Sequence, residues 1–333
     1  MWCKKKMMIG MLMPAFLLAV LVAPTRTYAR NPFGCDFFAA AVITDNAFIA
    51  VGDRGKIFLT TDAGKTFTAV ESNTKASLSA VRFPDASQGW IVGQGGVILH
   101  SANGGKTWVP QSSGVDKYLM AVDFLDVAHG CAVGADSTVI VTADGGKTWT
   151  RSDLTLAKDV GGEYNLFAVK MLGPASICMT GDMGRIFLSP NAGKTWSEGA
   201  SPLFDKANGE GRILYTLASS AGTLLAIGID GSLIISHDNG KTWIEGASAT
   251  KEPEYFSLAF VDAFGFAVGS GGTIQHTGNG GATWQVVKVP EKVFKAWLSG
   301  IALKKNAAGD VVGLVVGQYG TVGVIKNNQI VWQ

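Results

Sequence analysis

Four aspartates stand in short turn-like segments between apolar runs, where carboxylate chemistry is a possibility to test. They are Asp53, Asp136, Asp182 and Asp230. Two carboxylates on either side of a sugar are the basic requirement for glycoside hydrolysis. The spacing singles out no pair, and aspartate is common in turns because its side chain bonds to nearby backbone groups. The aspartates alone therefore do not predict catalysis.

The arginines and histidines give a second test. Holding the carboxylate of an acidic sugar takes several arginines, and only Arg54, Arg151 and Arg212 lie in comparable segments, with Arg185 at the start of an apolar run. The four histidines lie elsewhere in the repeat described below, and no Cys or His cluster has metal-ligand spacing. We therefore expect no catalytic residues, no metal and no cofactor.

An internal repeat sets the elements that position these residues. The pattern Ser/Thr-x-Asp/Asn-x-Gly-x-Thr-aromatic occurs six times, and an eroded seventh copy ends at Trp332, with Asn327 at the acidic position. The acidic or amide position and the terminal aromatic are, in chain order, Asp62 and Phe67, Asn103 and Trp108, Asp144 and Trp149, Asn191 and Trp196, Asp238 and Trp243, and Asn279 and Trp284. The aromatics recur every 41 to 48 residues, a period typical of repeat architectures.

Each period is long enough for four short strands. A glycine stands eight residues before every copy of the pattern, between two apolar runs, and glycine permits the positive φ that tight hairpins need. A further apolar segment lies upstream, as in residues 78–83 and 119–124. Four strands per period make one propeller blade. The sequence predicts an all-β fold, a seven-bladed β-propeller of four-stranded antiparallel blades over residues 30–333.

The eight-residue pattern resembles the Asp-box, or bacterial neuraminidase repeat, of sialidases, some other glycoside hydrolases and sorting receptors. The resemblance implies that the Asp or Asn side chain accepts backbone N–H groups in the turn between the third and fourth strands. It also implies that the aromatic ring is buried between sheets. We expect these residues to be structural, rather than calcium or sugar sites.

The N-terminal segment has the features of a secretory signal peptide over residues 1–29. Lys4, Lys5 and Lys6 precede an apolar stretch from Met7 to Ala23, and Ala29 offers a small residue at a cleavage site. An uncleaved membrane anchor is the alternative. Without the leader the chain has 24 basic and 26 acidic residues. We therefore expect an exported protein, periplasmic or secreted, with no nucleic-acid partner.

The three cysteines after the leader are an odd number. Cys131 and Cys178 occupy equivalent positions in neighbouring blades, and such positions are usually too far apart for a disulfide. We expect both to be separate buried thiols.

Propeller topology assigns the loops to two faces. The repeated eight-residue turns share one face with the turns between first and second strands, so the variable loops gather on the other face, around the mouth of the channel. Propellers usually bind partners there. The aromatic and basic residues predicted to bind a partner on this face are Arg54, Tyr118, Tyr164, Arg212, Tyr255, Trp297 and Tyr319.

The whole repeat resembles one family in particular. Residues 78–108 and 119–149 carry most completely the composite pattern Leu-x-Ala-Val-x-Phe, then Gly-x-x-Val-Gly-x-x-Gly-x-Ile, then Ser-x-Asp-Gly-Gly-Lys-Thr-Trp. This pattern is similar to that of the photosystem II stability/assembly-factor-like propellers. The resemblance implies a non-catalytic protein that binds membrane-protein subunits during assembly.

Two hypotheses follow from the sequence. The first is an exported, monomeric, non-enzymatic scaffold that binds a protein partner and assists a membrane or envelope complex. The alternative is a carbohydrate-binding or glycoside-hydrolase propeller of the sialidase type, since aromatic rings beside acids also suit sugar stacking.

Overall fold

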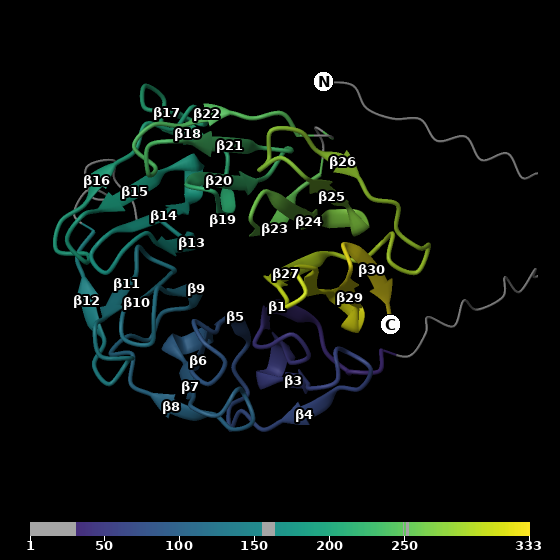
Figure 1. Cartoon of the computed structure of the whole chain (residues 1–333). Coiled ribbons are helices and arrows are strands. Elements are labelled where there is room, and N and C mark those ends of the chain that lie inside the picture. Colours follow the sequence, from purple (N-terminus) through teal and green to yellow (C-terminus); the bar gives the residue numbers. More distant parts are fainter. Residues whose placement is uncertain (1–30, 155–163, 249, 251–252) are drawn as a thin grey trace, which may run out of the picture. The chain divides into compact units, whose positions relative to one another are not determined.

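The computed structural model describes residues 31–154, 164–248, 250 and 253–333. The signal peptide expected at residues 1–29 lies outside these residues. The described residues form seven four-stranded antiparallel sheets around a central channel, each with its strands in chain order from the channel outward (Figure 1). This confirms the seven-bladed β-propeller.

Each blade contributes one strand to each of four concentric positions, named A to D from the channel outward. The A strands are β1 (Phe37–Val42), β5 (Leu78–Arg82), β9 (Leu119–Phe124), β13 (Leu166–Met171), β19 (Leu214–Ser220), β23 (Tyr255–Val261) and β27 (Leu298–Lys305). The B strands are β2 (Phe48–Gly52), β6 (Gly89–Gly93), β10 (Gly130–Gly134), β14 (Ile177–Gly181), β20 (Thr223–Gly228), β24 (Phe264–Gly269) and β28 (Val311–Gly317). The C strands are β3 (Ile57–Thr60), β7 (Ile98–Ser101), β11 (Val139–Thr142), β15 (Ile186–Ser189), β21 (Leu233–Ser236), β25 (Ile274–Thr277) and β29 (Val322–Lys326). The D strands are β4 (Thr68–Val70), β8 (Val109–Gln111), β12 (Thr150–Ser152), β16 (Ser197–Glu198), β22 (Ile244–Glu245), β26 (Gln285–Val286) and β30 (Gln329–Trp332).

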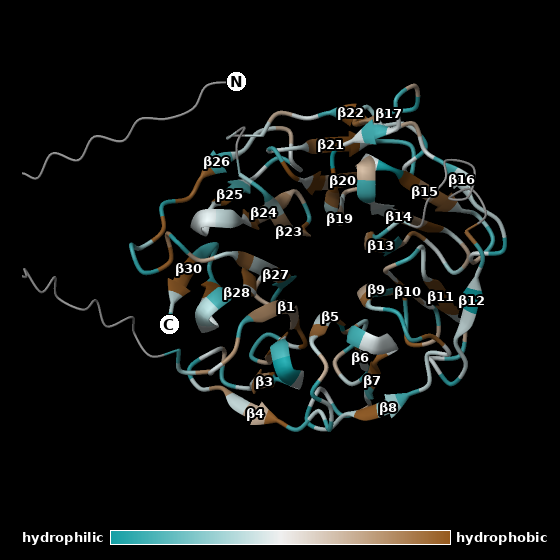
Figure 2. Ribbon diagram, turned by 180° about the vertical axis from the view of Figure 1, so that it is seen from behind, coloured by the Kyte–Doolittle hydropathy of each residue, from teal (hydrophilic) through white to brown (hydrophobic). Residues whose placement is uncertain are grey.

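Burial explains why the B strands are continuous apolar runs. In blades 1 to 4, for example, every residue of the B strand is buried, because the neighbouring blades cover both faces of the sheet. The D strands are short and largely exposed, as in β4 and β8. In Figure 2, many of the turns are hydrophilic, and inner strands such as β20 are hydrophobic.

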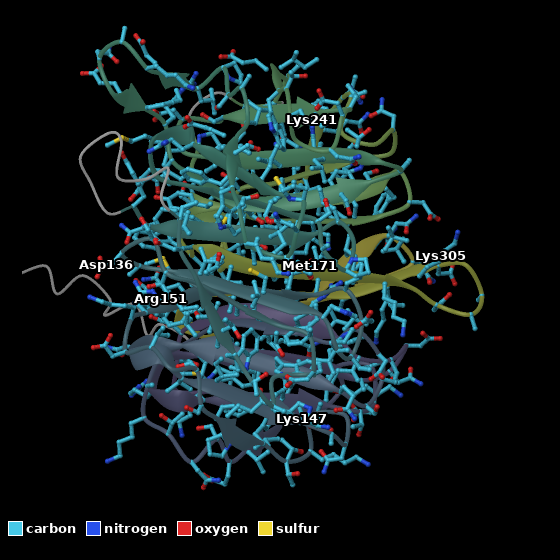
Figure 3. The ribbon with its side chains drawn as sticks, turned by 90° about the vertical axis from the view of Figure 1, so that its left-hand side faces the viewer. Asp136, Lys147, Arg151, Met171, Lys241 and Lys305 are labelled. Atoms are coloured by element: carbon cyan, nitrogen blue, oxygen red, sulfur yellow. The ribbon has the colours of Figure 1, made fainter. Side chains whose placement is uncertain are left out.

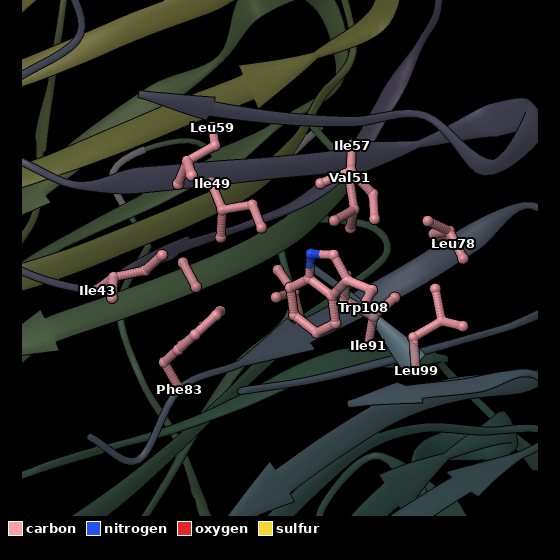
Figure 4. Packing of buried hydrophobic residues seen from close by; sticks show 12 residues of the cluster. Ile43, Ile49, Val51, Ile57, Leu59, Leu78, Phe83, Ile91, Leu99 and Trp108 are labelled. Atoms are coloured by element: carbon pink, nitrogen blue, oxygen red, sulfur yellow. The ribbon is translucent and has the colours of Figure 1, made fainter. Parts of the chain in front are cut away.

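The hydrophobic core is divided among the interfaces between blades. At the interface of blades 1 and 2, Trp108 packs edge-to-face on Phe83 with ring centroids 5.8 Å apart, among aliphatic side chains of both sheets (Figure 4). The Trp108 indole N–H donates to the carbonyl of Gly105 at 3.1 Å. The repeat therefore places an aromatic ring from each blade against the blade before it.

The ring closes without exchanging strands between the ends of the chain. Blade 7 is built from β27 to β30, and its outer strand follows a two-residue turn in which Asn327 and Asn328 both have positive φ. Blades 7 and 1 are joined instead by side chains. The Tyr319 amide donates to Asp36 Oδ1 at 2.7 Å, and Lys304 Nζ donates to the Ile43 carbonyl at 3.2 Å.

The cysteines follow the expectation from the sequence. Cys35, Cys131 and Cys178 are buried free thiols. Burial raises the pKa of Cys178 to about 12, so this thiol stays protonated and behaves as a small apolar side chain.

Candidate functional site

The B-to-C turns and the D-to-A loops share one face, which we call the entrance face. In blade 2, the amide of Gln94 in the B-to-C turn donates to the carbonyl of Ser77, which precedes the A strand, at 2.9 Å. A corresponding bond recurs in the other six blades. In the side view of Figure 3, Asp136, in a B-to-C turn, lies on the left, and Lys305, at the A-to-B turn of blade 7, lies on the right, so the two residues are on opposite faces of the propeller. The loops are therefore divided between two faces.

The repeated eight-residue turns lie on the opposite face, which we call the repeat-turn face. In blade 5, Asp238 accepts the Thr242 amide at 2.9 Å and the Thr242 hydroxyl at 2.7 Å, and Ser236 Oγ donates to it at 2.8 Å. These bonds hold the pKa of Asp238 down at about 2. The A-to-B turn joins this face, since the Ala63 amide donates to the Asn46 carbonyl at 2.8 Å in blade 1. The turn residues thus bond to one another.

Three of the seven residues predicted to bind a partner have exposed side chains on the entrance face. Trp297 and Tyr319 are 55% and 61% exposed. Arg54 is also exposed, with its Nε 2.9 Å from Asp53 Oδ2. Tyr118 is half-buried, and burial raises its pKa.

The other three lie differently from the expectation. Tyr255 is fully buried, and its hydroxyl bonds to Thr250 Oγ1 at 2.6 Å. Tyr164 is also buried, beneath the Arg185 guanidinium, whose carbon lies 4.6 Å from the ring centroid. The two tyrosines are therefore core residues and not surface anchors. Arg212 turns outward, to within 3.4 Å of Glu245 on the outer strand β22, so its charge lies away from the channel mouth.

Three of the four aspartates considered as catalytic carboxylates interact with neighbouring loop residues, and the fourth is exposed in a turn. Asp53 and Asp182 each accept the amide of the residue before the A strand, at 3.2 and 2.8 Å. Asp136 forms an ion pair with Lys117 at 2.6 Å. Asp230 is exposed, in a turn where it adopts a φ of 53°.

Every A strand contains a β-bulge, which leaves one of its residues without a partner in the B strand. In β13, Leu166 pairs with Gly181 and Ala168 with Thr180, so Phe167 has no partner. The same skip occurs in all seven blades, and each skipped residue lines the channel, a cavity of about 510 Å³. These seven residues, which we call the bulge ring, are Phe38, Ser79, Met120, Phe167, Tyr215, Phe256 and Ser299. Bulges commonly re-aim a side chain in this way.

The bulge ring is aromatic along one side. The ring centroids of Phe167 and Tyr215 are 5.3 Å apart, those of Tyr215 and Phe256 are 5.6 Å apart, and Trp297 lies 5.9 Å beyond Phe256. We call these four residues the aromatic row; they come from blades 4 to 7. The prediction from sequence included Trp297 and missed the other three. Aligning the repeats would have found them, since they occupy the variable position of Leu-x-Ala-Val.

The opposite end of the channel is charged. Asp123 is buried, with Arg82 Nε at 2.9 Å and Lys170 Nζ at 3.1 Å from its carboxylate oxygens, and it also accepts the Met171 amide. Arg82 and Lys170 stand at or near the last position of their A strands, towards the repeat-turn face. The channel therefore has an aromatic entrance and a cationic far end.

Within residues 31–154, 164–248, 250 and 253–333, no group of three or more His, Cys, Asp or Glu side chains is placed to hold a metal ion. In that part of the chain, no helix has the length and apolar character needed to cross a bilayer.

The chain was compared with known proteins. The family model described as "Photosynthesis system II assembly factor YCF48" matches residues 30–112 and 106–224. No curated protein matches. Among solved structures, one titled "YCF48 bound to D1 peptide" is 18% identical with a TM-score of 0.67, and the match covers 88% of this chain and 92% of that one. YCF48 from Cyanidioschyzon merolae is 20% identical with a TM-score of 0.66, over 87% and 95% of the two chains.

Enzymes also share this fold. The GH74 xyloglucanase from Xanthomonas campestris is 15% identical with a TM-score of 0.67, over 89% of this chain and 52% of the enzyme. At these identities the structural matches show the fold alone.

Proposed function

Because the chain belongs to the family of photosystem II assembly factor YCF48 propellers, we propose that it is an exported, non-enzymatic scaffold. In this proposal it binds a protein partner through its entrance face and assists the assembly or stability of a membrane or envelope complex.

The observation that carries the proposal is the combination of exposed aromatic rings and occupied carboxylates on the entrance face. Trp297 and Tyr319 are more than half exposed, and large aromatic side chains dominate protein interfaces. Asp53, Asp136 and Asp182 meanwhile bond to neighbouring loops or to Lys117, as a folded rim would require. A surface of this kind suits binding better than acid–base catalysis.

A related protein supports the choice of partner class. The solved structure titled "YCF48 bound to D1 peptide" shares the fold over most of both chains, and its title names a peptide ligand. We extend to this chain only the class of ligand, a polypeptide.

The proposal is tested by affinity capture from the native cell envelope with tagged protein. The double variant Trp297→Ala/Tyr319→Ala removes two exposed rings, whereas Asp310→Ala changes an exposed residue at the A-to-B turn of blade 7. We expect a defined membrane-protein complex to be captured by the wild type and by Asp310→Ala, and to be lost with the double variant. Equal capture by all three proteins would contradict the proposal.

Glycan binding is the second candidate, and the aromatic row favours it because sugars stack on aromatic faces. It predicts that polysaccharide, rather than protein, is recovered in the same capture experiment. A glycosidase would in addition lose turnover, with folding intact, when Asp53, Asp182 or Asp230 is replaced by Asn.

A further inference from the structure

The entrance of the channel is not chemically uniform around its circumference. Two members of the bulge ring, Ser79 in blade 2 and Ser299 in blade 7, are hydrogen-bonded to the next blade, where their Oγ atoms donate to the carbonyls of Leu119 and Phe37. Blades 4 to 7 present the aromatic row into and above the same cavity. The two serine hydroxyls are therefore used in hydrogen bonds between blades, while the aromatic row faces the channel.

Carboxylates accompany the aromatic row. Glu254 stands two residues before Phe256, and Asp182 accepts the amide of Asn165, two residues before Phe167. Burial raises the pKa of the Tyr215 hydroxyl, and these two carboxylates raise it further. Asp230 lies in the intervening blade, where the neighbouring Gly231 amide donates to the Pro253 carbonyl. Glu254 and Asp230 are exposed, and neither takes part in an ion pair among the described residues.

Two arginines close in sequence to these carboxylates are engaged elsewhere, whereas Lys295, two residues before Trp297, is exposed. The Arg212 guanidinium turns to Glu245 on the outer strand, and Arg185 is only 2% exposed. Glu254 and Asp230 are thus exposed carboxylates on the aromatic side of the mouth, and carboxylates beside aromatic faces attract a positively charged group.

The chain already contains a site of this chemistry in its interior. The Arg185 guanidinium lies over the rings of Tyr164, Phe187 and Phe204, at 4.6, 4.9 and 5.4 Å, and its Nε is 2.7 Å from Glu198. Three aromatic faces and one carboxylate thus hold one arginine in blade 4. The mouth of the channel offers aromatic faces and carboxylates without the arginine.

We propose that the aromatic row, together with Asp182, Asp230 and Glu254, receives an arginine or lysine side chain from an extended segment of the protein partner. The inference rests on the proposed function, because it specifies the partner chemistry that the entrance face recognises. The cationic head lies against the rings of Tyr215 and Phe256, and the flanking apolar residues of the segment contact Trp297. Arg82 and Lys170, at the far end, are paired with Asp123 and outnumber it by one positive charge, which favours the entrance for the cationic head.

The test uses a defined probe, N-acetyl-Leu-Arg-Leu-amide, and its citrulline analogue, which keeps the shape but lacks the charge. Protein with 5-fluorotryptophan is titrated by fluorine NMR, and the Trp297 signal is assigned with Trp297→Phe. We expect a saturable shift of that signal by the arginine probe, and about threefold to tenfold weaker binding of the citrulline probe.

Matched variants locate the site. Glu254→Gln removes one charge, Phe256→Leu removes one ring while filling much of its volume, and Asp310→Asn removes a carboxylate at the opposite face. We expect the first two to weaken binding of the arginine probe by about threefold to tenfold, and the third to leave it unchanged. Equal affinity for both probes, unchanged affinity in Glu254→Gln, or the absence of a saturable Trp297 shift would overturn the inference. A shift caused by xyloglucan oligosaccharide but not by the arginine probe would also overturn it.

The same variants separate this inference from the proposed function. If Glu254→Gln still captures the membrane-protein complex while Trp297→Ala/Tyr319→Ala does not, the scaffold function stands and the cationic segment is wrong. If neither variant differs from the wild type in capture, the proposed function itself fails.

Discussion

Replacing Trp108 by alanine should measure how strongly one repeat aromatic holds two blades together. Trp108 is 3% exposed, packs on Phe83, and donates its indole N–H to Gly105 (Figure 4). Truncating a buried tryptophan to alanine costs about 3–5 kcal/mol of unfolding free energy, which includes the cavity left behind. The unpaired Gly105 carbonyl places this site toward the upper end of that range.

The matched control is Trp297→Ala, which removes the same side chain from an exposed position. Surface substitutions of this kind cost less than about 1 kcal/mol. For a domain of this size, 1 kcal/mol corresponds to about 2 °C in Tm. We therefore expect Tm to fall by about 6–10 °C in Trp108→Ala and by about 2 °C or less in Trp297→Ala.

Differential scanning calorimetry of the two variants is the assay. The reasoning would be refuted by a Tm for Trp108→Ala within 2 °C of the wild type. It would be refuted equally if Trp297→Ala lost as much Tm as Trp108→Ala, because the two positions would then not differ in packing.

Three further predictions concern the turns and the channel. Hydrogen bonds lower the pKa of the repeat-turn aspartates below the unfolded value near 4, so the stability that they contribute is present above that pH and is lost as the pH falls toward 2. Replacing Asp62, Asp144 and Asp238 together by Asn should leave Tm at pH 7 unchanged and should flatten the decline of Tm between pH 5 and pH 2. An unchanged decline would show that protonation of these aspartates does not lower the stability. Gly134→Ala should strongly lower Tm, because its Cβ would clash with the backbone oxygen of Tyr118, whereas Gly278→Ala has open space and should change Tm by less than about 2 °C. Similar Tm values for the two variants would show that the close approach at Gly134 is not needed. Lys170→Met leaves the buried Asp123 carboxylate with one cation fewer, and should lower the free energy of unfolding, measured by urea titration, by about 1–3 kcal/mol. An unchanged free energy of unfolding would show that Lys170 does not stabilise Asp123.

The fold was predictable because the same local pattern recurs in every blade. Six copies combine a turn glycine, a side-chain acceptor and a terminal aromatic, so local pattern and global architecture agree. The outer strand of blade 7 is β30, which runs from Gln329 to Trp332. The two-residue turn at Asn327 explains why the seventh copy of the pattern is eroded.

The channel mouth was less predictable, for two physical reasons. Aligning the repeats places Phe167, Tyr215 and Phe256 at one variable position, but the β-bulges that aim them inward arise from strand pairing, which the alignment does not show. Tyr255 was expected on the surface, yet it occupies the place that Leu78 fills in blade 2, and in-phase alignment of the repeats would have indicated its burial.

The burial of Tyr164 depends on an unrelated segment. Its ring is covered by Arg185, which is held in turn by Glu198 and by Phe204 of the hairpin formed by β17 (Phe204–Asp205) and β18 (Glu210–Gly211). These residues are scattered along the chain and meet only in the folded blade. No spacing rule connects them.

The most direct test of the central claim is photo-crosslinking in the native cell envelope. The crosslinking residue p-benzoylphenylalanine is placed at Tyr319 on the entrance face or at Ala308 on the exposed A-to-B turn of blade 7. A scaffold that binds through its entrance face predicts a defined protein adduct from position 319 and none from position 308. The same adduct from both positions, or from position 308 alone, would contradict it.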